Sequence, residues 1–191
     1  MRLAILDRDG VINEDSPDFV KTPEQWVPIP GSLEAIARLC RAEYRVVIIT
    51  NQSGVGRGLF TLDMMNKINM RMFELINQKG GEIDALLFCP HTPDAGCECR
   101  KPKPGMFNEL ARRLKVNLTG IPAVGDSIRD LEAAVAAGAA PVLVRTGQGE
   151  KTLEAVRRDG SERLKRVPVY DNLAAFVDNH MLDDAARAII R

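Results

Sequence analysis

Residues 3–10 read LAILDRDG, an apolar run that ends directly in two aspartates separated by one arginine. A run that is apolar at every position is typical of a strand in a parallel sheet with both faces covered by helices. Similar short apolar runs alternate with amphipathic stretches along the chain, and this alternation is the pattern of α/β folds. The sequence therefore predicts an α/β domain with a central parallel sheet flanked by helices.

The expected elements follow the apolar patterns and the glycines that end them. We expect strands over residues 3–6, 46–49, 85–88, 121–124, 142–144 and 167–170. We expect helices from about Ser32, over 62–79 and 105–114, around 133–137, after Gly147 and again toward the C-terminus. Ser32 is the expected N-cap of the first helix, because the apolar residues after it recur at the spacing of one helix face.

Length and charge narrow the class of partner. The 191 residues fit a single domain spanning 1–191, without internal repeat or linker. The 26 basic and 26 acidic side chains balance, so no long-range field attracts nucleic acid or an anionic membrane. The N-terminal run lacks the pattern of a signal peptide, and no apolar stretch approaches the roughly 20 residues of a membrane span. We expect a cytoplasmic monomer with neither nucleic acid nor membrane as partner.

Polar clusters directly follow three of the expected strands. Asp7 and Asp9 follow the first, Thr50 ends the second, and Asp126 follows the strand at 121–124. Because strand C-termini in an open parallel sheet share one edge, these side chains should converge on one crevice. A phosphoryl-transfer site needs a nucleophile, a proton donor and cations, and Lys101 can add positive charge. Each cluster alone is more simply a turn, a surface pair or a helix cap, but their combination favours chemistry.

The ordered motifs resemble those of a known superfamily. DRDG at 7–10, TNQSG at 50–54, RKP at 100–102 and GDSxxD at 125–130 are similar to the four motifs of haloacid-dehalogenase-type phosphatases. The similarity extends from Asp7 to about Gly147. It implies a single Rossmann-like domain, and no insertion in this chain is long enough for a separate cap domain.

The resemblance implies a role for each motif. Asp7 would attack phosphorus and become an aspartyl phosphate, while Asp9 would protonate the leaving alkoxide and later activate water. Thr50 and Lys101 would hold the phosphoryl oxygens. The implied ligands of a catalytic Mg²⁺ are the Asp7 side chain, the main-chain carbonyl of Asp9, and Asp126, with Asp130 supporting the metal site.

A cysteine–histidine cluster interrupts the domain at residues 89–99. Its members are Cys89, His91, Cys97 and Cys99. Four nitrogen and sulfur ligands suit a closed, structural zinc site, although buried free thiols or a disulfide are alternatives. Because Cys99 is followed by Arg100 and then Lys101, a bound Zn²⁺ would hold in place the segment that carries the phosphate-binding lysine.

The pattern CPH followed by CECRKP resembles one branch of the superfamily, the D-glycero-D-manno-heptose 1,7-bisphosphate 7-phosphatases and the related histidinol-phosphate phosphatases. Features around 50–58 and 144–147 favour the heptose enzymes. That implies removal of the C7 phosphate in the synthesis of ADP-heptose and lipopolysaccharide core precursors. The residues expected to contact this sugar phosphate are Asp15, Ser16, Pro17, Asp18, Asn51, Gln52, Ser53, Arg57 and Arg100.

Other functions stay open at this point. A histidinol-phosphate phosphatase, a non-catalytic zinc-bearing interaction module, and another activity of the superfamily are the alternatives. Asp9 disfavours dehalogenation, because a halide leaves without a proton. Ser127 departs from the heptose branch, where a basic residue often follows the Gly-Asp pair, so the contact to the far end of the substrate is undefined.

Overall fold

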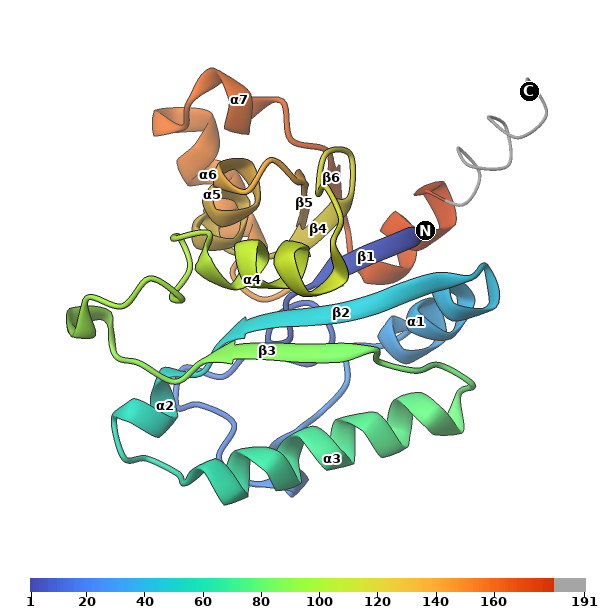
Figure 1. The fold of residues 1–191 in the computed structure, drawn as a ribbon, viewed down its shortest axis with the longest axis vertical. Coiled ribbons are helices and arrows are strands. Elements are labelled where there is room, and N and C mark those ends of the chain that lie inside the picture. Colours follow the sequence, from blue (N-terminus) through green and yellow to red (C-terminus); the bar gives the residue numbers. More distant parts are fainter. Residues whose placement is uncertain (181–191) are drawn as a thin grey trace.

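The computed structural model describes residues 1–180 and contains a six-stranded, fully parallel sheet in the order β3-β2-β1-β4-β5-β6 (Figure 1). Its strands are β1 (Arg2–Leu6), β2 (Tyr44–Asn51), β3 (Ala85–Cys89), β4 (Pro122–Gly125), β5 (Ala140–Val144) and β6 (Val169–Tyr170). The expected strands are confirmed with small shifts at their ends. This order places β1 in the middle of the sheet, between β2 and β4.

Helices connect the strands. They are α1 (Ser32–Arg41), α2 (Ser53–Gly56), α3 (Leu62–Gln78), α4 (Gly105–Leu114), α5 (Ile128–Ala136), α6 (Gly149–Asp159) and α7 (Glu162–Lys165), with short 3₁₀ turns η1 (Pro23–Gln25) and η2 (Pro93–Ala95). Residues 173–180 are also helical. The predicted C-terminal helical segment thus begins within the described residues, and its continuation past 180 lies outside them.

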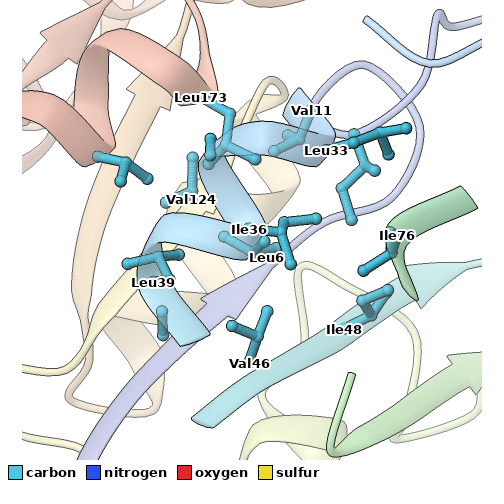
Figure 2. Packing of buried hydrophobic residues seen from close by; sticks show 14 of the residues in the cluster. Leu6, Val11, Leu33, Ile36, Leu39, Val46, Ile48, Ile76, Val124 and Leu173 are labelled. Atoms are coloured by element: carbon cyan, nitrogen blue, oxygen red, sulfur yellow. The ribbon is translucent and has the colours of Figure 1, made fainter. Parts of the chain in front are cut away.

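Alternate residues of β1 supply the two faces of the core. Ala4 and Leu6 pack in the cluster that contains α1 and α3, whereas Leu3 and Ile5 pack in the cluster that contains α4 and α5. Figure 2 shows the first face, where Ile36 of α1 lies close to Leu6 of β1. Burial on both faces is the physical reason why this strand is apolar at every position.

The strands that follow β1 in the chain are added first on one side of β1 and later on its other side. β2 and β3 lie on one side of β1, and β4, β5 and β6 lie on the other. A crevice forms at such a switch point, beyond the C-terminal ends of the two strands where the direction changes. The segments after β1 and β4, which begin with Asp7 and Asp126, therefore line the same opening.

Two local predictions differ from the structure. Gly31, not Ser32, is the N-cap of α1, because the Ser32 hydroxyl instead donates a 2.7 Å hydrogen bond to the carbonyl of Ile12. That bond fixes the start of α1 to the loop after β1. The short helix α2 was not predicted, since its glycine-containing sequence has no helical periodicity. Within residues 1–180, no helix is both long and apolar enough to cross a membrane.

Candidate active site

A cavity of about 310 Å³ opens at the switch point between β1 and β4. All four expected catalytic side chains line it: Asp7, Asp9, Thr50 and Lys101. Asp126 lines the cavity as well. The main-chain N–H of Asp7 donates to the carbonyl of Val124 at 2.9 Å, so Asp7 remains in register with β4 after β1 has ended. The convergence expected from the strand ends is present.

Asp7 lies at the floor of this cavity beside a buried cation. Lys101 Nζ is 3.0 Å from Asp7 Oδ1 and 2.6 Å from Asp130 Oδ1. Burial raises the pKa of Asp7 to about 7; the Lys101 cation opposes this rise, and the charges of Asp130 and Asp9 add to it. Burial lowers the pKa of Lys101, but the two aspartates outweigh it and leave that pKa above its usual value. The ammonium therefore stays charged beside the proposed nucleophile.

The backbone of Lys101 is fixed from the neighbouring strand. The Asn51 amide donates to the Lys101 carbonyl and accepts from the Lys101 N–H, both at 3.1 Å. Lys101 Nζ also donates to the carbonyl of Ile49 at 2.7 Å. Asn51, which the sequence suggested as a substrate contact, lines the cavity while both ends of its amide hold the lysine segment.

Asp9 is surrounded by hydrogen-bond donors. Arg8 donates to both carboxylate oxygens at 3.0–3.3 Å. Asn13 Nδ2 donates at 2.9 Å, and Gln52 Nε2 donates at 2.7 Å. Burial raises the pKa of Asp9, but Arg8 and these donors outweigh it and lower the pKa below its usual value. These donors therefore favour the ionised form of Asp9.

Asp126 occupies a tight space that two glycines create. A Cβ atom on Gly10 or on Gly147, both at positive φ, would overlap the Asp126 carboxylate. The Gln148 N–H donates to Asp126 Oδ2 at 2.7 Å. Burial, and next the charges of Asp130 and Asp7, raise the pKa of Asp126 to about 9. Asp126 forms no ion pair with a basic side chain among residues 1–180, and a buried acidic group of this kind is suited to a divalent cation.

The carboxylates fit a magnesium site by their chemistry and spacing. Asp7, Asp126 and Asp130 each offer an oxygen, and these oxygens lie within 4.8 Å of one another. Carboxylate oxygens are the ligands that Mg²⁺ prefers. Asp130 is already engaged, since its Oδ2 accepts from the Ser127 N–H and hydroxyl at 2.9 and 2.6 Å, and its other oxygen pairs with Lys101. Asp130 is thus better placed to support the site than to bind metal directly.

Metal binding at this cluster predicts a specific pH dependence of stability. In the folded state the pKa of Asp7 is about 7 and the pKa of Asp126 is about 9, both above the ordinary value of an aspartate. The folded state therefore holds protons that the unfolded chain has released, and stability without metal should fall as pH rises from about 5 to about 9. Mg²⁺ displaces these protons, so the rise in melting temperature on adding Mg²⁺ should grow over the same interval.

Calorimetry in magnesium-free buffer and with added Mg²⁺ measures both trends. In Asp126→Asn the Mg²⁺ effect should be small at every pH. An Mg²⁺ effect that is independent of pH, or unchanged in Asp126→Asn, would contradict the assignment.

The predicted zinc ligands lie close together, and the last of them, Cys99, comes two residues before Lys101. Cys89, Cys97 and Cys99 place their sulfurs 3.2–3.6 Å apart, and His91 Nδ1 lies 3.5 Å from Cys89 Sγ and 3.3 Å from Cys99 Sγ. These are about the edge lengths of a tetrahedron with metal bonds of 2.0–2.3 Å. They are too long for a disulfide bond, and all three cysteines are free. The four side chains therefore form a zinc-capable cluster.

Loss of zinc should disturb the lysine segment. Cys99→Ser should lower the zinc content and melting temperature and reduce turnover at least about tenfold, because the loop before Lys101 loses its anchor. Metal analysis, calorimetry and phosphate release measure these effects. Cys40→Ser, which changes the one cysteine outside the cluster, is the matched control. Full activity in a zinc-free, folded Cys99→Ser protein would rule out this role.

Most, but not all, of the expected substrate contacts line the cavity. Those that line the cavity are Asp15, Ser16, Asn51, Gln52, Ser53, Arg57 and Arg100. Pro17 and Asp18 are exposed and lie outside the cavity wall, because the chain turns back into the cavity only at Phe19. For these two, the structure gives no support to the expected contact.

Arg129 and Gln148 are polar cavity residues that sequence reasoning missed. Arg129 lines the wall from the first turn of α5, three residues after Asp126. Gln148 donates through Nε2 to Asp15 Oδ2 at 2.7 Å while its N–H holds Asp126. A basic residue in the first turn after Gly125-Asp126 could have indicated Arg129. Gln148 carries no recognisable signal in the sequence.

Comparisons with known proteins agree with this site. The family model described as HAD-hydrolase-like matches residues 98–175, and the model described as polynucleotide kinase 3 phosphatase matches residues 2–130. The D-glycero-beta-D-manno-heptose-1,7-bisphosphate 7-phosphatase of Bordetella bronchiseptica is 58% identical over 153 residues, which cover 80% of this chain and 86% of that protein. The enzyme of the same name from Pseudomonas putida is 50% identical and covers 92% of this chain and 97% of its own length.

Solved structures give the same result. The crystal structure of the D,D-heptose 1,7-bisphosphate phosphatase from B. bronchiseptica, complexed with magnesium and phosphate, matches with a TM-score of 0.91 and 51% identity, over 96% of this chain and 99% of that one. The corresponding phosphatase from Burkholderia thailandensis matches with a TM-score of 0.73 and 41% identity, over 95% and 99% of the two chains.

Fold and site together define a phosphatase of the haloacid-dehalogenase superfamily. The superfamily resemblance of the sequence motifs is thereby confirmed. Within that superfamily, the chain belongs to the D-glycero-beta-D-manno-heptose-1,7-bisphosphate 7-phosphatase family.

Proposed function

We propose that this protein hydrolyses the C7 phosphate ester of D-glycero-D-manno-heptose 1,7-bisphosphate through an aspartyl-phosphate intermediate, with Mg²⁺ as cofactor. The observation that carries the proposal is the position of Asp7, which lines the cavity with Lys101 Nζ at 3.0 Å and a carboxylate oxygen of Asp126 within 4.8 Å. Nucleophilic attack on phosphorus requires a carboxylate that lies beside a fixed cation and beside further carboxylates able to hold a metal ion.

The first half-reaction transfers the phosphoryl group to Asp7. An Asp7 oxygen forms a bond to phosphorus as the bond from phosphorus to the C7 oxygen breaks, and Asp9 gives its proton to that oxygen. Lys101 and the Thr50 hydroxyl offset charge on the phosphoryl oxygens. Bound Mg²⁺, held by Asp7, Asp126 and the Asp9 carbonyl, would supply further positive charge to the transferring phosphoryl group.

The second half-reaction frees the enzyme. Asp9 takes a proton from a water molecule whose oxygen attacks phosphorus, and the bond between phosphorus and Asp7 breaks to release inorganic phosphate. The donors around Asp9 favour its ionised form, which is the form that this step needs. A bound phosphate dianion next to Asp9 raises the pKa of that carboxyl, which favours the protonated form needed in the first step.

The second phosphate of the substrate, which does not react, would bind to a cationic rim. We define this rim as Arg57, Arg100 and Arg129. All three line the cavity, and none forms an ion pair with a carboxylate among residues 1–180. Burial, and next the charge of Arg129, lower the pKa of Arg100, with a smaller effect from Arg57. Guanidinium groups that repel one another and have no acidic partner are suited to a second phosphate. The rim would repel the ammonium of histidinol phosphate.

Phosphate release from the heptose bisphosphate and from histidinol phosphate, each with and without Mg²⁺, tests the proposal. The expected result is Mg²⁺-dependent release with a higher kcat/KM for the bisphosphate. A higher kcat/KM for histidinol phosphate would show that the protein is instead a histidinol-phosphate phosphatase. No release from any phosphate ester by a folded, metal-loaded protein would remove the catalytic proposal and favour a non-catalytic module.

Arg129 gives a sharper prediction when the bisphosphate is compared with heptose 7-phosphate. Arg129→Ala should raise KM for the bisphosphate about tenfold, with little change in kcat. A tenfold change corresponds to the free energy that one charge-assisted hydrogen bond usually contributes. Arg129→Lys should recover part of this loss, and the effect on heptose 7-phosphate should be small. Arg41→Ala, at an exposed position at the end of α1, is the control. Equal losses on both substrates would show that Arg129 does not bind the second phosphate.

A further inference from the structure

Arg8 is a buried cation that the mechanism above leaves unexplained. Its side chain is among the largest fully buried ones, with a relative exposure of 1%. Removing a guanidinium from water is costly unless every donor finds a partner. Each of the three nitrogens of the Arg8 guanidinium has a partner, and these partners are Asp9, Gln52 and Asn69. The residue between the two catalytic aspartates is thus held from three directions.

Asn69 comes from a distant part of the chain. It lies on α3, 61 residues after Arg8, and its Oδ1 accepts from Arg8 Nη1 at 3.0 Å. Its side chain is buried, with 6% exposure, on the helix face that otherwise buries Met65, Ile68 and Met72. A polar amide in an apolar stripe destabilises packing unless it has a partner, and here its partner is the Arg8 guanidinium.

The remaining donors of Arg8 are directed at Asp9. Nε and Nη2 contact both carboxylate oxygens at 3.0–3.3 Å, so the planar guanidinium meets the planar carboxylate. Gln52 joins the two, because its Oε1 accepts from Arg8 Nη2 at 3.0 Å and its Nε2 donates to Asp9 Oδ2 at 2.7 Å. A guanidinium is rigid, so fixing Nη1 at Asn69 also fixes the atoms that contact Asp9.

We propose that Asn69 is a positioning residue for the proton donor Asp9, acting through Arg8. The inference rests on the proposed phosphatase function and assigns to α3 a part in the reaction. Without the acceptor at position 69, Arg8 can rotate, and the Asp9 carboxylate spends less time where it can reach the leaving oxygen. Proton transfer depends on this distance, so the loss should appear where leaving-group protonation limits the rate.

Leaving-group chemistry distinguishes this role from general destabilisation. A sugar alkoxide needs a proton as it leaves, whereas 4-nitrophenolate is a stable anion and leaves without one. The value of kcat/KM reports the steps up to loss of the leaving group. Poor positioning of Asp9 should therefore lower kcat/KM for the heptose bisphosphate far more than for 4-nitrophenyl phosphate.

The test uses Asn69→Leu, which keeps the approximate shape but removes the acceptor, and Asn69→Asp, which keeps an acceptor oxygen. Asn69→Leu should lower kcat/KM for the bisphosphate about tenfold and for 4-nitrophenyl phosphate less than about twofold. Asn69→Asp should stay within about threefold of the unchanged protein on both esters. The matched control is Asn66→Ala, at an exposed position of the same helix.

Circular dichroism and melting temperature establish that each variant is folded. Equal losses on the two esters, or none on the bisphosphate, would overturn the positioning role. If Asn69→Leu does not fold, the comparison of Asn69→Asp with Asn69→Ser, a shorter side chain that does not reach Arg8, decides in the same way. Absence of turnover of either ester by the unchanged protein would instead refute the proposed function, and this inference with it.

Discussion

Asp7→Asn should give a folded protein whose turnover of phosphate esters is at least about 10³-fold below that of the unchanged chain. An amide of the same shape cannot form the bond to phosphorus that starts the reaction. Folding should not suffer, because burial and neighbouring acids already raise the pKa of Asp7 to about 7. Removing that carboxyl relieves an unfavourable environment, so the metal-free melting temperature should stay the same or rise.

Phosphate release and calorimetry on the same preparation measure both effects. Asp63→Asn is the control, since it removes an exposed carboxylate whose ion pair with Lys67 contributes little. A folded Asp7→Asn protein with a near-normal rate would remove Asp7 as the nucleophile. A loss of activity accompanied by unfolding would contradict the stability argument.

Lys101→Met should have the next largest effect and should act on both activity and stability. Lys101 is buried, with 2% exposure, and its ammonium neutralises Asp7 and Asp130 at 3.0 and 2.6 Å. Removing one partner of a buried ion pair costs about 3–5 kcal/mol, because the remaining charges are uncompensated. Loss of a cation that stabilises the transferring phosphoryl group should lower kcat/KM about 10²- to 10³-fold.

The pH dependence separates this account from a simple packing defect. Without the cation, the pKa of Asp7 and of Asp130 should rise, and the stability deficit of Lys101→Met should grow with pH as those groups ionise. Chemical denaturation at several pH values measures it. Lys103→Met is the matched control, because Lys103 is exposed and its ammonium forms an ion pair with the exposed Glu98. A deficit that does not change with pH would indicate lost packing instead.

The sheet was predictable because buried parallel strands leave a simple pattern. Apolar runs such as residues 3–6 and 46–49 have few other interpretations, and glycines marked the ends of α3 and α5. The capping of α1 was not predictable, because the Ser32 hydroxyl has a tertiary partner in Ile12, twenty residues earlier. A serine before an apolar helix looks the same in sequence whether it caps that helix or bonds elsewhere.

The catalytic cluster was predictable for a geometric reason. Asp7, Thr50 and Asp126 each end or follow a parallel strand, so a correct strand prediction brings them to one edge of the sheet. The zinc-capable cluster was predictable because its four members lie within eleven residues and need little tertiary structure to meet.

The surroundings of the site depend on long-range contacts and were missed. Asn69 reaches Arg8 across 61 residues, and Gln148 reaches Asp15 across 133. Neither pair has a sequence signature, because only the packing of α3 and the start of α6 against the central strands brings them together. Pro17 and Asp18, which neighbour cavity residues in sequence, are exposed and do not line the cavity, so their contact with substrate stays a prediction.

The most direct test of the proposed mechanism is mass spectrometry of protein quenched in acid during turnover of the heptose bisphosphate. The account predicts that a fraction of the chain gains the mass of one phosphoryl group, and that fragmentation places it on Asp7. In Asp7→Asn this species should be absent, and in Asp9→Asn it should be formed slowly and persist longer, because no base activates water. Steady turnover without a phosphorylated chain, or a phosphoryl group on another residue, would contradict it.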